Sequence, residues 1–121
     1  MENYEINKAI EDFKRRLEEL DRALDIQKLK EDLAHDEGLM ENSNFWNNIK
    51  ESNKVLKEVK VLKYKIETYQ ELTGLLDDLQ VYFDMFKEGE NLDDEISNAI
   101  EGLEKKLSAF EIEMLLSGEY D

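Results

Sequence analysis

The side chains that could carry out catalysis or bind a metal are few in this chain, and none falls into a recognisable arrangement. The single histidine, His35 in LAHDEG, has no second histidine to pair with, and the chain contains no cysteine. A histidine without such partners is more often a surface or helix-end residue than a metal ligand. The acidic runs 77–78 and 93–95 lack the twelve-residue spacing of a calcium loop, and consecutive helical positions do not face one another. Helix capping and solvation account for both runs.

Enzymatic chemistry is not indicated elsewhere in the sequence. There is no glycine-rich phosphate loop and no nucleophile in a Ser, His and Asp setting. Carboxylates are abundant only because acids are abundant: 31 Asp and Glu oppose 16 Lys and Arg, giving a formal net charge of −15. Such a surface as a whole repels a bare nucleic-acid backbone. We therefore expect a non-enzymatic protein with no cofactor and no bound metal.

Composition favours one soluble helical domain. The chain has 121 residues, no proline and five glycines, which permits long helices and disfavours a turn-rich β fold. No apolar run approaches the ~20 residues of a membrane span, and the start, MENYEINKAIEDF, lacks the regions of a signal peptide. A cytoplasmic protein with no membrane partner is the simplest expectation.

Apolar residues at spacings of three and four predict helices over about 4–23, 25–38, 48–88 and 92–116. The first seam is expected to contain Ile6, Ile10, Phe13, Leu17, Leu20 and Leu24, and the second Ile26, Leu29 and Leu33. The third is expected to contain Val55, Val59, Leu62, Ile66, Tyr69, Thr73, Leu76, Leu79, Phe83 and Phe86, and the fourth Ile96, Ile100, Leu103, Leu107, Phe110 and Met114. The alternation in the third helix slips at Thr73-Leu76-Leu79, which predicts an irregularity near Gly74.

Capping residues support these boundaries. Asp25, Asn48 and Asn91 are expected to cap the second, third and fourth helices. Gly38 and Gly89 are expected to end the second and third. The polar loop over 40–48 contains Phe45 and Trp46, which we expect to plug the end of a helical core rather than to anchor a ligand or partner. The fold class is all-α: an elongated antiparallel bundle of three to four helices with a long third helix.

One stretch departs from the acidic character of the chain. The first part of the third predicted helix contains six lysines and only two acids, Glu51 and Glu58. The lysines are Lys50, Lys54, Lys57, Lys60, Lys63 and Lys65. A solvated helix face is the favoured interpretation, and a contact to an acidic partner is the alternative.

The end of the fourth helix is more apolar than a bundle needs. Its seam requires only Phe110 and Met114, but Ile112, Leu115 and Leu116 are apolar as well. A helix that is hydrophobic on every side is normally buried on every side. We therefore expect these three residues to form an exposed patch that contacts a neighbouring domain.

Three blocks resemble a known family, in the right order and with fitting spacing. FEIEMLLSGEYD, at 110–121, resembles the segment that closes the N-terminal helical domain of bacterial peptide chain release factor 2, a class I translation release factor. LDIQKLKEDLAHDE, at 24–37, resembles the family's Leu-Asp followed by a short charged helix. NSNFWNN, at 42–48, resembles its aromatic-Trp-Asn turn, with Ser43 where the family often has proline.

The resemblance implies that residues 1–116 form this helical domain and that 117–121 begin a linker to a codon-reading and catalytic region. Tyr120 would then join the contact between domains. The family's stop-codon tripeptide and Gly-Gly-Gln loop lie in later domains, and neither occurs in this sequence. This part alone should neither read codons nor hydrolyse peptidyl-tRNA.

The resemblance implies a factor that directs translation termination at UAA and UGA codons. Within that factor, it implies that this domain has a positioning role on the ribosome. The implied partners are proteins at the base of the large-subunit stalk, the GTPase release factor and the remaining domains of the same factor. An acidic rod suits basic ribosomal proteins better than RNA, and we expect Glu101, Glu104 and Glu111 to form the partner surface.

Two other classes of protein fit the same residues. A free-standing acidic coiled-coil adaptor would self-associate through its apolar seams. An acidic nucleic-acid mimic would spread carboxylates over an exposed face and would give no reason for Ile112, Leu115 and Leu116.

Overall fold

The computed structural model describes residues 1–119, which form four α-helices, one short 3-10 helix and no strand. The all-α class predicted from the apolar spacing is therefore confirmed, and the boundaries of the helices agree with the prediction to within about two residues. The elements are α1 (Asn3–Leu24), α2 (Ile26–Met40), η1 (Ser43–Asn47), α3 (Ile49–Lys87) and α4 (Asp93–Leu116).

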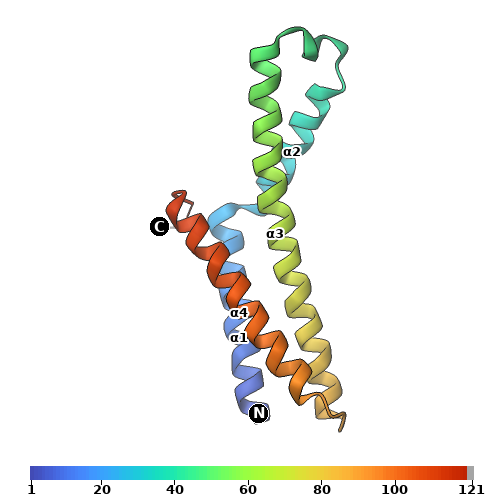
Figure 1. Ribbon diagram of the computed structural model, residues 1–121, viewed down its shortest axis with the longest axis vertical. Coiled ribbons are helices and arrows are strands. Elements are labelled where there is room, and N and C mark those ends of the chain that lie inside the picture. Colours follow the sequence, from blue (N-terminus) through green and yellow to red (C-terminus); the bar gives the residue numbers. More distant parts are fainter. Residues whose placement is uncertain (120–121) are drawn as a thin grey trace.

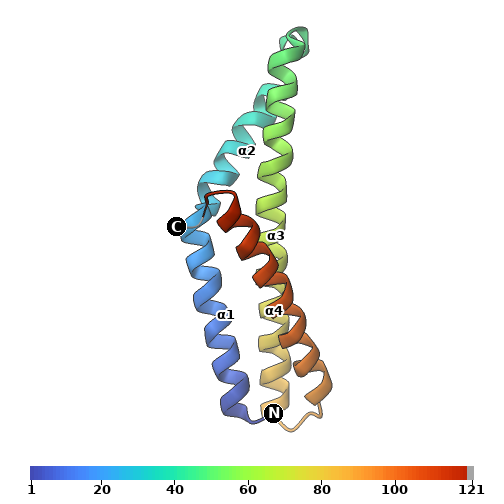
Figure 2. The same ribbon diagram turned by 60° about the vertical axis from the view of Figure 1, so that its left-hand side comes forward.

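The long helix α3 sets the shape of the molecule (Figure 1). Its 39 residues extend for about 58 Å at 1.5 Å per residue, whereas the 24 residues of α4 extend for about 36 Å. Helices α1 and α4 flank the C-terminal half of α3, and α2 covers its N-terminal half (Figures 1 and 2). The molecule is thus a three-helix bundle at one end and a two-helix hairpin, α2 with α3, at the other.

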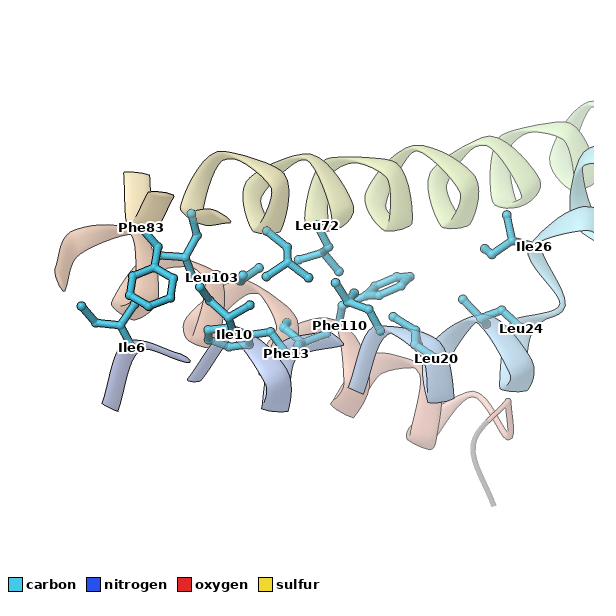
Figure 3. Close-up of a cluster of buried hydrophobic side chains, with 14 of the residues drawn as sticks. Ile6, Ile10, Phe13, Leu20, Leu24, Ile26, Leu72, Phe83, Leu103 and Phe110 are labelled. Atoms are coloured by element: carbon cyan, nitrogen blue, oxygen red, sulfur yellow. The ribbon is translucent and has the colours of Figure 1, made fainter. Parts of the chain in front are cut away.

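The main hydrophobic core lies in the three-helix part (Figure 3). All six predicted seam residues of α1 are buried, with exposed fractions of 5% or less. At one end of this core Ile6 lies beside Phe83, and at the other end Leu24 lies near Ile26 (Figure 3). The remaining buried members come from α3 and α4: Leu72, Leu76, Leu79, Ile96, Leu103, Leu107, Phe110 and Met114.

Helix α3 runs unbroken through Gly74, but the expected position of the slip in its seam is wrong. Leu72 is buried, whereas the Thr73 hydroxyl donates a hydrogen bond to the backbone carbonyl of Gln70 at 2.9 Å. The buried face of α3 therefore advances by three residues twice in succession, from Ile66 to Tyr69 and from Tyr69 to Leu72, instead of alternating steps of three and four. At 100° per residue these two steps of three turn the buried face of α3 by roughly 100°. This rotation coincides with the change of partner from α2 to α1 and α4.

A single residue separates α1 from α2. Asp25 adopts the left-handed conformation, with φ 54° and ψ 72°, and it is both the C-cap of α1 and the N-cap of α2. Its side chain accepts a hydrogen bond from the backbone N–H of Lys28 at 3.3 Å, so the predicted cap is confirmed. The chain can therefore change direction without a loop between these helices.

Gly89 ends α3 as predicted. It has φ 104°, and its N–H donates to the carbonyl of Phe86 while the N–H of Glu90 donates to that of Met85. This pair of bonds is the Schellman arrangement, which needs a residue with positive φ and therefore favours glycine.

Two predicted boundaries are wrong in detail. Helix α2 continues through Gly38 to Met40. Asn91 does not cap α4, because that helix starts at Asp93 and leaves Leu92 in the capping position without a side-chain hydrogen bond. The acidic residues of the first turn complement the helix dipole in place of a cap.

The expectation that the aromatic pair plugs a core is also wrong. Trp46 is 53% exposed, and Phe45 is half-buried beside it, with ring centroids 4.8 Å apart at an interplanar angle of 89°. Both belong to η1, which lies at the free end of the α2–α3 hairpin (Figure 1). Two helices cannot enclose a side chain as three can, so the tryptophan stays in contact with solvent.

The α2–α3 hairpin contains a buried acid that the apolar pattern did not reveal. Asp36 is 5% exposed, and its Oδ2 has no hydrogen-bond donor among residues 1–119. A buried polar atom without a partner costs free energy. We predict that Asp36→Leu raises the free energy of unfolding by about 1–2 kcal/mol, measured by urea denaturation.

Glu31→Leu is the matched control, because Glu31 lies on the exposed side of the same helix. We expect that variant to change stability by no more than about 0.5 kcal/mol. A loss of stability in Asp36→Leu would show that the carboxylate is satisfied in solution.

Candidate functional site

The C-terminal end of α4 divides into a buried side and an exposed apolar side. Phe110 and Met114 are 1% and 4% exposed. Ile112, Leu115 and Leu116 are 57%, 56% and 82% exposed. The last three lie at helical positions i, i+3 and i+4 and therefore share one face. We call these three residues the apolar patch.

A shallow hollow adjoins the apolar patch. It has a volume of about 290 Å³ and is lined by Ser108, Glu111, Ile112 and Leu115. The hollow offers mostly carbon atoms with one carboxylate at its edge, so it suits an apolar side chain of another segment better than a charged ligand.

Polar contacts fix this end of α4 to α3. The Tyr64 hydroxyl donates to the Glu113 carboxylate, at 2.7 Å from Oε2, and this hydrogen bond raises the pKa of Tyr64 above its usual value. Lys65, whose side chain is 14% exposed, pairs with Glu119 at 2.5 Å. These two contacts hold the end of α4, which carries the apolar patch, against α3.

The chain after α4 turns sharply. The N–H of Gly118 donates to the carbonyl of Leu115, and the N–H of Glu119 donates to that of Met114. Gly118 has φ 85°, as the C′ position of a Schellman motif requires. The predicted helix stop at Ser117-Gly118 is confirmed. Tyr120 was expected to join an interdomain contact and lies outside the described residues.

A cluster of charged groups ties α1 to α4. Arg16 donates from Nη2 and Nε to the two oxygens of Glu111, at 2.5 and 3.3 Å, and from Nη1 to Glu104 at 3.0 Å. Its Nη2 also contacts the Ser108 hydroxyl at 3.2 Å. The Arg16 side chain is only 14% exposed, and its hydrogen bonds with Glu111 raise the pKa of Arg16.

This cluster changes the interpretation of the predicted acidic surface. Glu111 is not a freely exposed acid as expected, because Arg16 holds it and its side chain is only 25% exposed. Glu104 is more exposed but is also bound to Arg16. Glu101 is exposed and has no ion-pair partner among residues 1–119. Of the three predicted partner-surface residues, Glu101 keeps its charge most available to another molecule.

Sequence reasoning missed Arg16 and Lys65 as organising residues. Arg16 lies 95 residues from Glu111, and Lys65 lies 54 residues from Glu119, so spacing gives no sign of either pair. Each is a basic residue bordering a seam, next to Leu17 or Ile66, and this position beside a buried residue is the only local signal.

Neither a metal centre nor a membrane span is found where the structure is described. Over residues 1–119, no three His, Asp or Glu side chains converge on a point where an ion could bind. None of the helices combines the length and the apolarity required to traverse a bilayer.

Comparison with known proteins identifies the family. A family model described as the PCRF domain matches residues 29–121. The chain belongs to the PCRF domain family. Its match begins within α2 and includes η1, α3 and α4, so the aromatic turn and the apolar patch both lie inside the PCRF domain.

Curated relatives extend the similarity over the whole chain. Peptide chain release factor 2 of Acholeplasma laidlawii is 37% identical over 121 residues, which is 100% of this chain and 33% of that protein. The same-named protein of Clostridium perfringens is 31% identical over 93% of this chain and 31% of its own length. That of Exiguobacterium is 31% identical over 100% of this chain and 34% of its own length. The chain spans about a third of the curated relatives that it matches.

These relatives confirm the resemblance to peptide chain release factor 2 that the three sequence blocks indicated. No solved structure matches the chain.

Proposed function

We propose that this PCRF domain positions a class I peptide chain release factor on the ribosome during translation termination. The observation that carries the proposal is the match of the PCRF domain model to residues 29–121, together with relatives named peptide chain release factor 2 along the whole chain. The long α3 supports a positioning role, because a rod of about 58 Å can connect distant contacts.

The domain itself is proposed to be non-enzymatic and to act in the cytoplasm. Its sequence has no Gly-Gly-Gln segment, and its charge disfavours direct reading of nucleic acid over most of its surface. Recognition of UAA and UGA codons and hydrolysis of peptidyl-tRNA would belong to the other two thirds of such a factor. Its proposed partners are proteins at the stalk base and the GTPase release factor, with Glu101 as a candidate contact.

The apolar patch is proposed as the surface against which the remaining domains of the same factor pack. Burying one leucine side chain is favourable by about 2 kcal/mol. Because Leu116 is 82% exposed in this domain, most of that free energy is still available to a neighbour. The hollow beside Ile112 would receive an apolar side chain of that neighbour, and Arg16 keeps the Glu111 charge at its edge neutralised.

A self-associating coiled-coil adaptor is less well supported. Such a protein needs unfilled apolar seams, but the seams of α1, α3 and α4 are packed against one another within one chain. The exposed apolar residues lie instead at the end of α4.

A chimeric factor tests the proposed role of the apolar patch. In it, residues 1–121 replace the matching third of Acholeplasma laidlawii peptide chain release factor 2. We predict that Leu115→Asp with Leu116→Asp lowers the rate of peptide release from stop-codon ribosomes by about tenfold or more. The reason is that an interface which buries two carboxylates loses several kcal/mol.

The matched control places the same two charges near the opposite, N-terminal end of α4, as Ser97→Asp with Asn98→Asp, where both residues are exposed. Peptide release by the control should match that of the parent chimera. Equal release by the patch variant and the parent would rule out the patch as a functional contact.

A further inference from the structure

The free end of the α2–α3 hairpin differs in charge from the rest of the molecule. Residues 42–65 contain six lysines and two glutamates, a formal charge of +4, while the rest of the chain carries −19. Figure 1 shows that η1 and the first turns of α3 form the end farthest from the N-terminus and from α4, whereas Tyr64 and Lys65, at the other end of this stretch, already contact Glu113 and Glu119. The end is therefore a separate basic region on an otherwise acidic rod.

Four of the lysines occupy one exposed face of α3. Lys50, Lys54, Lys57 and Lys60 are all exposed, and none forms an ion pair within the described residues. At 100° per residue they fall within a sector of roughly 120°, opposite the face that packs on α2. Lys63 and Lys65 are engaged by Glu37 and Glu119 and are not part of this set. We call the four free residues the lysine face.

The start of α3 adds to the positive potential. Asn48 caps the helix by accepting from the N–H of Glu51 at 3.1 Å, and the dipole of the 39-residue helix places its positive end here. The lysine face thus begins at the helix end that already attracts anions.

An exposed aromatic ring lies at the same end. Trp46 precedes Lys50 by four residues, so their backbones are at most about 14 Å apart. Its ring is held edge-on by Phe45 and is 53% exposed. A large apolar surface that is fixed in place and left in water is suited to stacking with a flat partner.

We propose that the lysine face and Trp46 form a binding site for RNA at a segment with unpaired bases. Phosphates would contact the lysines over about 15 Å of helix, and an unpaired base would stack on Trp46. An acidic peptide would satisfy the lysines but has no general need of a flat aromatic surface, so RNA accounts for both features. This site lies beyond the proposed contacts to proteins and to other domains, and its test requires no termination assay.

The 121-residue chain itself provides the readout, because Trp46 is its only tryptophan. The probe is a short RNA hairpin with an unpaired purine loop, compared with a blunt-ended duplex of the same stem. We expect the hairpin to quench Trp46 fluorescence saturably and to bind more tightly than the duplex. Its log affinity should fall with log salt concentration with a slope of about −3, as four phosphate contacts predict.

Variants separate the two parts of the site, with binding followed by anisotropy of labelled RNA. Trp46→Leu should weaken hairpin binding by about 5- to 100-fold and leave duplex binding nearly unchanged. Lys50→Gln with Lys54→Gln should reduce the salt slope by about 1.5. Lys8→Gln with Lys105→Gln makes the same change of charge on exposed positions of α1 and α4 and should leave the slope unchanged.

All five substituted positions are exposed, so the variants should keep the helical circular dichroism of the parent chain. The proposal is overturned if the hairpin does not quench Trp46, if Trp46→Leu binds it as tightly as the parent, or if both lysine pairs alter the salt slope equally. Tighter binding of poly-glutamate than of the hairpin would instead assign the surface to an acidic protein.

Discussion

Phe110→Ala is expected to lower the free energy of unfolding by about 3–5 kcal/mol, the range found when a fully buried aromatic side chain is truncated. Phe110 is 1% exposed and belongs to the core shared by α1, α3 and α4. Its ring also meets Tyr64 at 6.1 Å with an interplanar angle of 73°, an edge-to-face contact. The variant loses transfer free energy, packing contacts and this aromatic pair together.

Urea denaturation followed by circular dichroism measures the effect. Ile112→Ala is the matched control, because it lies two residues away on the same helix and is 57% exposed. That control should change stability by less than about 0.5 kcal/mol. Comparable losses in both variants would contradict the division of α4 into a buried and an exposed side.

Arg16→Ala is expected to lower the free energy of unfolding by about 2–3 kcal/mol. Removing the guanidinium leaves Glu111 partly buried without its counter-charge, next to Glu104 and Asp12. Breaking a fully buried pair costs about 3–5 kcal/mol, and the smaller value allows for the partial exposure of these carboxylates.

Arg16→Lys distinguishes charge from geometry. Lysine keeps the positive charge but cannot hold both oxygens of Glu111 in the two-pronged arrangement that Arg16 makes. The free energy of unfolding of Arg16→Lys should therefore lie between that of the parent chain and that of Arg16→Ala. A double-mutant cycle that combines Arg16→Ala with Glu111→Gln should give a coupling free energy of about 1–2 kcal/mol. A coupling near zero would mean that the pair is absent in solution.

The spacing of apolar residues predicted the helices and most of the core, because a helix face repeats every three or four residues. Every seam residue expected in α1 is buried. The same rule misplaced the slip in α3, choosing Thr73 over Leu72. The choice depends on which helix packs beside each half of α3, and a local pattern contains no such information.

The sequence predicted the apolar patch for a different reason. Three apolar residues beyond the needs of the seam, Ile112, Leu115 and Leu116, indicated an exposed face, and the structure leaves all three exposed. By contrast, Trp46 was assigned to a core end, because an aromatic residue alone does not reveal how many helices surround it. Its exposure follows from the two-helix construction of the hairpin, which only the fold shows.

The contacts that organise the candidate site could not be predicted. Arg16 meets Glu111 across 95 residues, and Lys65 meets Glu119 across 54. In a chain with 31 acidic and 16 basic residues, many such pairs are possible and composition selects none of them. Only the antiparallel placement of α4 on α3, with α1 alongside, decides which charges become neighbours.

The central claim is that this PCRF domain positions a release factor, and the rate of stop-codon-dependent peptide release tests it most directly. Three proteins should be compared at limiting concentration: intact Acholeplasma laidlawii peptide chain release factor 2, that factor without its matching third, and the chimera in which residues 1–121 supply it. We predict that the shortened factor releases peptide slowly, that the chimera recovers most of the intact rate, and that the 121-residue chain alone releases none. A folded chimera that is no faster than the shortened factor would contradict the claim.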